Sequence, residues 1–75
     1  KVGRMAVLKE ARKLGYGARL LQALLLEARR RGNKEVRLSA QSTAENFYAL
    51  HGFCSVGEPF DEVGIAHVEM RLMLV

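Results

Sequence analysis

The amino-acid sequence predicts an α+β domain whose elements follow the order β-α-β-α-β-β. Two observations support this prediction. A short apolar run leads through a glycine loop into a long helical pattern and a further strand, and such a unit joins parallel strands by a right-handed crossover. Two later segments alternate apolar and polar residues with the period of a half-buried strand. Because the last two strands fit an antiparallel hairpin, we expect a mixed sheet.

The first half of the chain is expected to form one strand and the longer helix. Residues 4–8 (Arg-Met-Ala-Val-Leu) are mostly apolar and suit a buried strand. The helical pattern extends from the glycine loop to Arg31, and Gly32-Asn33 is a helix stop of the usual kind. One face of this helix carries a stripe of apolar side chains, namely Leu20, Leu21, Leu24, Leu25 and Ala28.

The same helix is apolar on more than one side. Ala18, Ala23 and Leu26 lie outside the main stripe. A helix of this kind is expected to be covered by neighbours on several sides, and four strands and two helices offer too little cover. We therefore expect a further segment or a partner chain to pack against it.

The second half is expected to hold four further elements and one loop. They are a strand over residues 35–40, a helix over 44–50, a strand over 53–56, a loop over 57–64 and a strand over 67–74. The first and last of these strands alternate apolar and polar side chains. Ser42 or Thr43 is placed to cap the short helix, and His51-Gly52 ends it.

Length and composition indicate one small globular domain. The chain has 75 residues, of which 49% are hydrophobic and 27% charged. A domain of this size buries only about 60% of the surface of its unfolded chain. No apolar run approaches the ~20 residues that cross a membrane, and no signal-peptide pattern follows Lys1. We expect a cytoplasmic protein without a membrane partner, and the start at Lys1 suggests a processed product or a fragment of a longer chain.

The net charge of +4 does not by itself predict nucleic-acid binding. The triplet at residues 29–31 closes the first helix, where cations complement the negative end of the helix dipole. No aromatic residues interleave with the basic clusters, so we expect no nucleic-acid partner. The single Cys54 cannot form an internal disulfide and is expected to be a small apolar filler beside Phe53. No Cys/His cluster has metal-ligand spacing, so no metal is expected.

The segment 12–18, Arg-Lys-Leu-Gly-Tyr-Gly-Ala, lies between the first strand and the first helix. Glycines at such a place let the backbone turn tightly and approach a ligand closely. The free N–H groups of the helix start and the positive end of the helix dipole form an anion site. Arg12 and Lys13 add positive charge beside it. A pyrophosphate is the natural occupant, although a glycine pair after a strand also fits a plain tight turn.

Three sequence motifs, which follow one another along the chain, make the interpretation of this segment more specific. Arg12, Gly15 and Gly17 stand at the diagnostic places of the Arg/Gln-x-x-Gly-x-Gly/Ala signature of the GCN5-related N-acetyltransferase (GNAT) superfamily. The segment 41–53, Gln-x-x-Ala-x-x-Phe-Tyr-x-x-x-Gly-Phe, is similar to that family's Asn-x-x-Ala-x-x-Leu-Tyr-x-x-x-Gly-Phe block. The tail over 57–70 resembles the ElaA-like branch of the superfamily. The resemblance therefore covers nearly the whole chain.

The resemblance implies the C-terminal half of the acyl-CoA N-acyltransferase fold, with acetyl-coenzyme A as co-substrate. In this family the amides of the glycine loop hold the pyrophosphate of the coenzyme, and the end of the preceding strand pairs with its pantetheine arm. Gln41, where the family more often has Asn, would hydrogen-bond that arm. The implied coenzyme-binding residues are Ala6, Val7, Leu8, Arg12, Lys13, Leu14, Gly15, Tyr16, Gly17, Ala18 and Gln41.

Tyr48 falls on the position of the family's usual general acid, which protonates the departing thiolate. A phenol has an unperturbed pKa of about 10 and can give its proton to a strong thiolate base. The alternative is an amphipathic core residue behind Phe47. His67 resembles a histidine of the ElaA-like branch, or is a polar residue on the solvent side of the last strand. Glu62 and Glu69 could be bases, but surface carboxylates are common.

The resemblance also implies that residues 1–75 form a single partial domain. The family's domain has three strands and one or two helices ahead of this part, and they build much of the acceptor pocket. The leading hypothesis is therefore an N-acetyltransferase that transfers acetyl directly to a small-molecule or peptide amine. A missing segment, or a second chain in a homodimer, would complete it. A non-catalytic coenzyme-binding or dimerising module is the second hypothesis, and a small nucleic-acid binder is the third.

Overall fold

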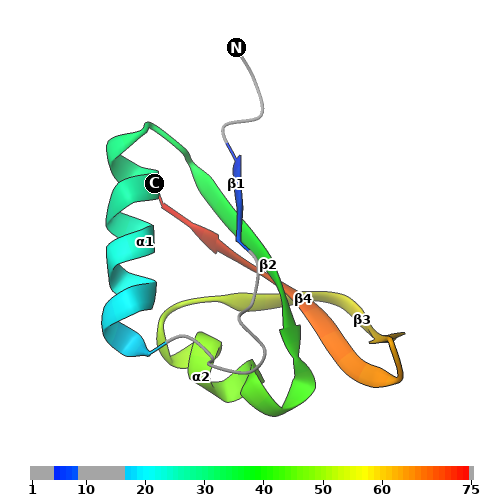
Figure 1. Ribbon diagram of the computed structural model, residues 1–75. Coiled ribbons are helices and arrows are strands. Elements are labelled where there is room, and N and C mark those ends of the chain that lie inside the picture. Colours follow the sequence, from blue (N-terminus) through cyan, green and yellow to red (C-terminus); the bar gives the residue numbers. More distant parts are fainter. Residues whose placement is uncertain (1–4, 9–16, 75) are drawn as a thin grey trace.

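The computed structural model (Figure 1) describes residues 5–8 and 17–74, which form one four-stranded sheet with two helices. The elements are β1 (Met5–Leu8), α1 (Ala18–Arg30), β2 (Glu35–Gln41), a 3-10 turn η1 (Ser42–Ala44), α2 (Glu45–Leu50), β3 (Cys54–Glu62) and β4 (Ile65–Met73). This order confirms the predicted β-α-β-α-β-β arrangement.

The strands are arranged in the order β1-β2-β4-β3. β1 and β2 are parallel, with Met5 opposite Glu35 and Leu8 opposite Leu38. β4 is antiparallel to both β2 and β3, so the sheet is mixed as predicted. Because α1 connects two parallel neighbours, it runs back from the end of β1 to the beginning of β2. The start of α1 therefore lies at the edge of the sheet where β1 and β2 end (Figure 1).

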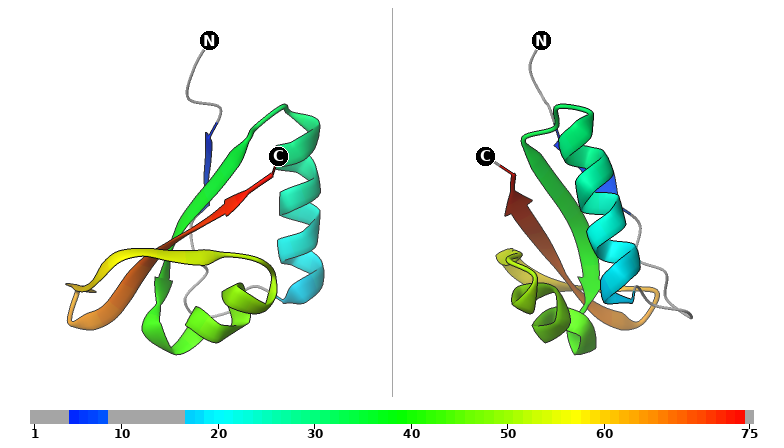
Figure 2. Two further views of the ribbon diagram at one scale, coloured as in Figure 1. Left: turned by 180° about the vertical axis from the view of Figure 1, so that it is seen from behind. Right: turned by 90° about the vertical axis from the view of Figure 1, so that its left-hand side faces the viewer.

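Both helices cover the same face of the sheet. Successive strand residues point to opposite faces, and every second residue of β1, β2 and β4 shares a core with side chains of α1 and α2. Figure 2 shows the two helices beside the sheet from two further directions. The buried core consists of Leu21, Ala28, Val36, Leu38, Ala40, Tyr48, Phe53, Val68, Met70 and Leu74. The opposite face carries the charged side chains of β2 and β4 together with the exposed Met5, Val7 and Met73. Neither helix covers this second face.

The two helices end in the same way. Gly32 and Gly52 follow the last turns with φ of 84° and 97°, a left-handed conformation that favours glycine. After α1, the Asn33 N–H donates to the Ala28 carbonyl at 3.0 Å, and after α2 the Phe53 N–H donates to the Tyr48 carbonyl at 3.1 Å. These bonds satisfy carbonyls that a helix end leaves unpaired. The predicted stops at both glycines are confirmed.

The expected loop over residues 57–64 is wrong. β3 continues through this segment to Glu62, with an irregularity in its pairing between Val56 and Phe60, and β4 begins at Ile65. Only Val63 and Gly64 form the turn, both with positive φ, as a two-residue hairpin requires. The Gly and Pro residues that suggested a loop are tolerated because β3 is an edge strand with a bulge.

Three further expectations need correction. Ser42 and Thr43 lie within η1, and no side-chain cap is made at the start of η1 or α2. Leu20, placed on the core stripe of α1 by the sequence, is half exposed, because the buried side of the helix centres on Leu21. Cys54 is exposed, because it follows the buried Phe53 in an extended segment and points to the other face.

Candidate functional site

Three features meet at the carboxyl edge, by which we mean the edge of the sheet where β1 and β2 end. The first is the flank of β2 that faces away from β4. Pairing with β1 stops at Leu38, whereas β2 continues for three residues to Gln41 and pairs there only with β4 within residues 5–8 and 17–74. Over residues 39–41, this flank of β2 extends past the described part of β1.

The second feature is the start of α1. Gly17 is the N-cap, no side chain caps the helix, and the first turn contains no acidic residue. The first intrahelical bond runs from the Leu21 N–H to the Gly17 carbonyl at 3.0 Å, so the N–H groups of the first turn have no acceptor within the helix. A Cβ at Gly17 would find no atom within 4 Å, which leaves open space above these donors. The arrangement suits an anion.

The third feature is Tyr48 in α2, which follows β2 directly through η1. Its side chain is only 1% exposed. The ring makes edge-to-face contacts with Phe47 at a centroid distance of 5.1 Å and with Phe53 at 5.8 Å. The ring of Tyr48 is thus a core element in a position that packing fixes.

The sequence-predicted coenzyme residues fall into two groups. Arg12, Lys13, Leu14, Gly15 and Tyr16 lie outside the described residues. The others are at or near the carboxyl edge: Ala6, Val7 and Leu8 in β1, Gly17 and Ala18 at the start of α1, and Gln41 at the end of β2. Ala6 and Leu8 pack against the core, whereas Val7 is exposed on the uncovered face.

His67 is a residue whose role the sequence left open, and of the two alternatives the solvent-exposed one does not hold. It is 3% exposed, and its ring lies nearly parallel to that of Phe60 at a centroid distance of 6.0 Å. Its Nδ1 is 2.8 Å from the Ile65 carbonyl oxygen, and its Nε2 is 4.0 Å from Oε1 of Glu62. The sequence signal for this burial was weak, because the alternation in β4 assigns His67 to the face opposite the core.

A ladder of ion pairs crosses the uncovered face. Arg37 donates to Glu35 at 2.9 Å and to Glu69 at 2.8 Å, and Arg71 lies 3.7 Å from Glu35. The hydrogen bond to Glu35, followed by the one to Glu69, raises the pKa of Arg37 above its ordinary value. Glu69 is therefore engaged in the sheet, which makes it a poor candidate for a free base.

Other kinds of site find no support in the described parts of the chain. Residues 5–8 and 17–74 contain no group of three His, Cys, Asp or Glu side chains that could hold a metal ion. No helix among them has the length and apolar character needed to span a bilayer. A cytoplasmic location stays a prediction.

Comparison with known proteins assigns the chain to a protein family. The chain matches the family model of the acetyltransferase (GNAT) domain over residues 1–74. It belongs to the GNAT acetyltransferase family. UPF0039 protein sll0451 of Synechocystis is 36% identical over 69 residues, which are 91% of this chain and 45% of that protein.

Solved GNAT structures agree. An acyl-CoA N-acyltransferase from Pseudomonas aeruginosa is 36% identical with a TM-score of 0.72, over 83% of this chain and 42% of that one. Escherichia coli ElaA is 33% identical with a TM-score of 0.66, over 72% of this chain and 36% of its own. The predicted resemblance, including that to ElaA, and the fold of the C-terminal half are confirmed. The chain spans less than half the length of these proteins.

Proposed function

We propose that this GNAT chain binds acetyl-coenzyme A and supplies the coenzyme-binding part of an N-acetyltransferase that acetylates a small-molecule or peptide amine directly. The observation that carries the proposal is the start of α1 at the carboxyl edge, which has no side-chain cap and lies beside the end of β2. One feature suits the anionic end of the coenzyme and the other its extended arm.

The start of α1 would hold the pyrophosphate. N–H groups of residues 14–18 would donate to its oxygens, and the positive end of the helix dipole would favour its charge. Arg12 and Lys13 would add positive charge, and no carboxylate in the first turn of α1 opposes it. The open space at Gly17 gives the phosphate oxygens access to the backbone.

The flank of β2 would hold the pantetheine arm between the ends of β1 and β2. The arm contains amides, which can exchange hydrogen bonds with strand backbone as a peptide does. Ala6, Val7 and Leu8 would line it on one side, and Gln41 would hydrogen-bond it on the other. This places the thioester near the last residues of β2.

Acetyl-coenzyme A supplies the activated acetyl group and a thiolate leaving group. An N–H group of β1 would stabilise the negative charge that develops on the thioester oxygen. The phenol of Tyr48 would donate its proton to the leaving thiolate. The contacts of its ring with Phe47 and Phe53 support this role, because they fix the ring and leave little freedom to the hydroxyl.

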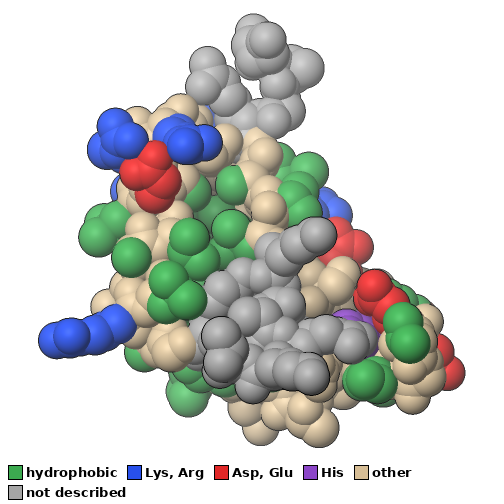
Figure 3. All heavy atoms as spheres, in the orientation of Figure 1, with side chains coloured by type: hydrophobic (Ala, Val, Ile, Leu, Met, Phe, Trp, Pro, Cys, Tyr) green, Lys and Arg blue, Asp and Glu red, His purple; other side chains and the backbone are tan. Residues whose placement is uncertain are grey.

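A complete acceptor site would need more than residues 1–75. The uncovered sheet face and the outer side of α1 both present exposed apolar side chains, as Figure 3 shows for the surface over α1. We propose that a further segment or a second copy of the chain covers part of this surface and completes the amine pocket. The chain would then act as one part of a GNAT domain.

A second function is favoured by the outer side of α1. A hollow there is lined by Gln22, Leu25, Leu26 and Arg29, with Leu26 largely exposed. This surface also suits a non-catalytic coenzyme-binding module that associates through α1. Such a module would bind acetyl-coenzyme A without acetylating any amine.

Calorimetric titration of the chain with acetyl-coenzyme A tests the proposal, with the mass in solution measured in parallel. We expect saturable binding with one coenzyme per chain, and competition by inorganic pyrophosphate at the start of α1. Absence of binding by a folded chain would contradict the proposal. Binding without acetylation of lysine, spermidine or tyramine by the assembled form would favour the non-catalytic module.

A further inference from the structure

We propose that the β3–β4 hairpin carries a pH-sensitive clasp, in which the protonated ring of His67 binds the carboxylate of Glu62 and holds the hairpin end closed. When the ring is neutral this bond is absent, and the turn of the hairpin opens more often. Three observations carry the inference: the buried and oriented ring of His67, the carboxylate that faces it, and a strained turn at Val63. The clasp concerns the hairpin alone and does not rest on the proposed function.

The ring of His67 is held with one nitrogen towards β3. Its Nδ1 is 2.8 Å from the carbonyl oxygen of Ile65. A carbonyl oxygen only accepts hydrogen bonds, so Nδ1 carries the proton of the neutral ring and Nε2 keeps its lone pair. The side chain is 3% exposed, and its ring lies nearly parallel to that of Phe60, the opposite residue on β3. Because these contacts fix the ring, a second proton must go to Nε2.

Glu62 is the carboxylate in front of Nε2. Its Oε1 is 4.0 Å from Nε2, which is beyond hydrogen-bond distance. Glu62 pairs with Ile65, two residues from His67 along β4, so the side chains of Glu62 and His67 share the uncovered face. A neutral ring has no proton on Nε2 to donate to this carboxylate. A charged ring has one, and hydrogen bonds between two charged groups are shorter and stronger than those between neutral groups.

The exposed side of the pair allows the bond to form without a change in the core. The side chain of Glu62 is 54% exposed, whereas that of His67 is 4% exposed. A rotation of the Glu62 side chain therefore closes the remaining distance while the ring stays in place. The moving part of the clasp is the carboxylate, and the fixed part is the imidazole.

The turn between the two strands works against the closed hairpin. Val63 and Gly64 form this turn with φ of 53° and 76°. Glycine adopts such a conformation readily, whereas a β-branched residue is strained there. The side chain of Val63 is 85% exposed, so little packing offsets the strain. The hairpin end is therefore a place where one added contact shifts the balance between closed and open forms.

The other groups around the ring on the described part of the chain leave Glu62 as its partner. On β3, the neighbour beside Glu62 is the uncharged Phe60. On β4, Glu69 is two residues along the same face and is bound to Arg37 at 2.8 Å. On β2, the residue opposite His67 is the uncharged Gln41. The charge of the ring is thus coupled mainly to Glu62.

The direction of the pH dependence follows from these contacts. Histidine side chains in general change charge between about pH 5 and 8, a range in which most carboxylates are ionised. The clasp is therefore present in mild acid, where the ring is charged, and is lost as the pH rises and the ring loses its proton. Burial disfavours the charged ring and the facing carboxylate favours it. Removal of the carboxylate must then weaken the binding of the proton.

Nuclear magnetic resonance titration of the whole chain tests the contact. A His51→Gln variant assigns the ring signals, since the chain has two histidines. We expect Glu62→Gln to lower the proton affinity of His67 by about two- to fivefold, the range typical of an exposed ion pair. Asp61→Asn is the matched control, because Asp61 is the neighbouring exposed carboxylate on the opposite face of β3. Equal effects of the two variants, or a proton on Nε2 of the neutral ring, would overturn the clasp.

Amide hydrogen exchange at residues 62–65 tests the opening of the turn. After correction for the intrinsic pH dependence of exchange, we expect protection to be about two- to fivefold higher in mild acid than at neutral pH. In Glu62→Gln the two values should be equal, and the same is expected of His67→Gln. If His67→Gln fails to fold, Glu62→Gln decides, because it changes an exposed side chain. Protection that does not depend on pH in the unchanged chain would contradict the proposal.

A variant of the turn tests the part played by strain. Val63→Asn gives the Asn-Gly pair that two-residue hairpins prefer. We expect protection of residues 62–65 to rise at both pH values while the ratio between the two values is kept, because the turn and the clasp act on the same opening. Unchanged protection in Val63→Asn would overturn the view that a strained turn opposes the clasp.

Discussion

Leu21 and Leu26 lie five positions apart in α1 and have opposite surroundings. Leu21 is 0% exposed in the core, and Leu26 is 67% exposed on the outer side of the helix. We expect Leu21→Ala to lower the free energy of unfolding by about 2–5 kcal/mol, because it removes buried methyl groups and leaves a cavity. Leu26→Ala, the matched control, should change it by roughly 0.5 kcal/mol or less. Urea denaturation measures both, and equal losses would contradict the described orientation of α1.

Tyr48 has a ring in the core and a hydroxyl group for which we propose a catalytic role. A substitution can remove the hydroxyl and keep the ring. Tyr48→Phe keeps the buried ring and its contacts with Phe47 and Phe53. We expect kcat to fall by about 10²–10⁴-fold while coenzyme affinity is unchanged, because only the proton donor is lost. The unfolding curve of the variant serves as the control. Unchanged turnover would leave Tyr48 as a core residue only.

Which face a side chain takes was the least predictable property of single residues. Cys54 was expected to be a small apolar filler and is exposed, and His67, for which the sequence left a solvent-facing position open, is buried. Both lie in strands that contact neighbours far along the chain. Local alternation assigns them to one side of the sheet, but the exposure of that side depends on Phe60 and on the strand order.

The start of α1 allows a test in which stability and ligand affinity move in opposite directions. Gly17→Asp places a carboxylate at the N-cap, which should stabilise the helix by about 0.5–1 kcal/mol. The same charge should repel a pyrophosphate, so we expect coenzyme affinity to fall about tenfold, or roughly 1.4 kcal/mol. Gly17→Asn is the control, since it caps without charge. Equal affinities of the two variants would argue against an anion at this helix end.

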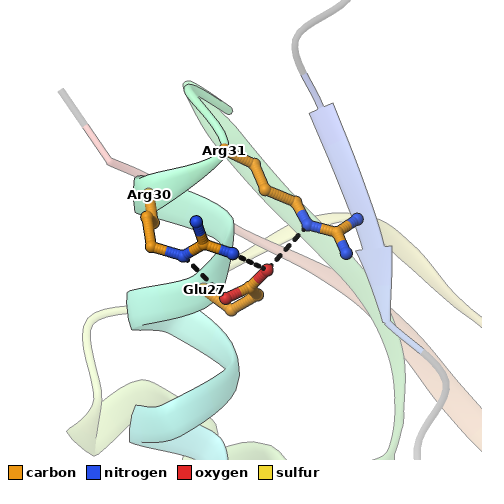
Figure 4. A network of polar contacts seen from close by, with 3 residues as sticks. All are labelled: Glu27, Arg30 and Arg31. Carbon is orange, nitrogen blue, oxygen red and sulfur yellow. Dashed lines mark hydrogen bonds and ion pairs between the residues drawn. The ribbon is translucent and has the colours of Figure 1, made fainter.

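The ion pairs in the last turn of α1 make a pH-dependent contribution to the free energy of unfolding. Glu27 accepts hydrogen bonds from Arg30 Nε at 3.1 Å and Nη2 at 2.8 Å, and from Arg31 Nε at 2.8 Å (Figure 4). The bonds from Arg30 and then Arg31 lower the pKa of Glu27 below its ordinary value of 4.5. Because the pKa of Glu27 is lower in the folded chain, its ion pairs stabilise the fold fully at a pH above the ordinary pKa. This stabilisation disappears as the pH falls through the lowered pKa.

The replacement Glu27→Gln tests that contribution. At neutral pH and low salt, we expect a slightly lower urea midpoint than for the unchanged chain. The two midpoints should converge as the pH falls through the lowered pKa, and also in high salt, because the pair is exposed and screened. A difference that persists in acid would show that the ion pairs are not its cause.

Among the elements, the order and the helix ends followed from the sequence, whereas the extent of β3 did not. Gly57 and Pro59 are typical loop residues, and local reasoning could not tell a loop from an irregular strand. The pairing with β4 decides the matter, because Glu62 and Phe60 find partners there despite the bulge. An edge position leaves room for a residue without an N–H donor.

The whole molecule presents more apolar surface than so small a chain can cover. Leu20 and Leu26 are exposed on α1, and Met5, Val7 and Met73 are exposed on the uncovered face. We expect sedimentation to give a mass above that of one chain at micromolar concentration. Leu26→Lys should shift the mass towards the monomer if α1 forms the contact, whereas Glu58→Lys on β3 should not. A monomeric chain that still binds coenzyme would indicate a separate covering segment instead.

The sequence alone determined the order of elements, the glycine stops of both helices and membership of the GNAT family. Local sequence patterns predict these properties, namely helical and strand periodicity, glycine positions and short motifs. The tertiary structure decided which side of each element is covered. It buried His67 beside Glu62, exposed Cys54 and Leu20, and extended β3 along β4. The reason is that burial depends on neighbours far along the chain, and periodicity within one segment carries no information about them.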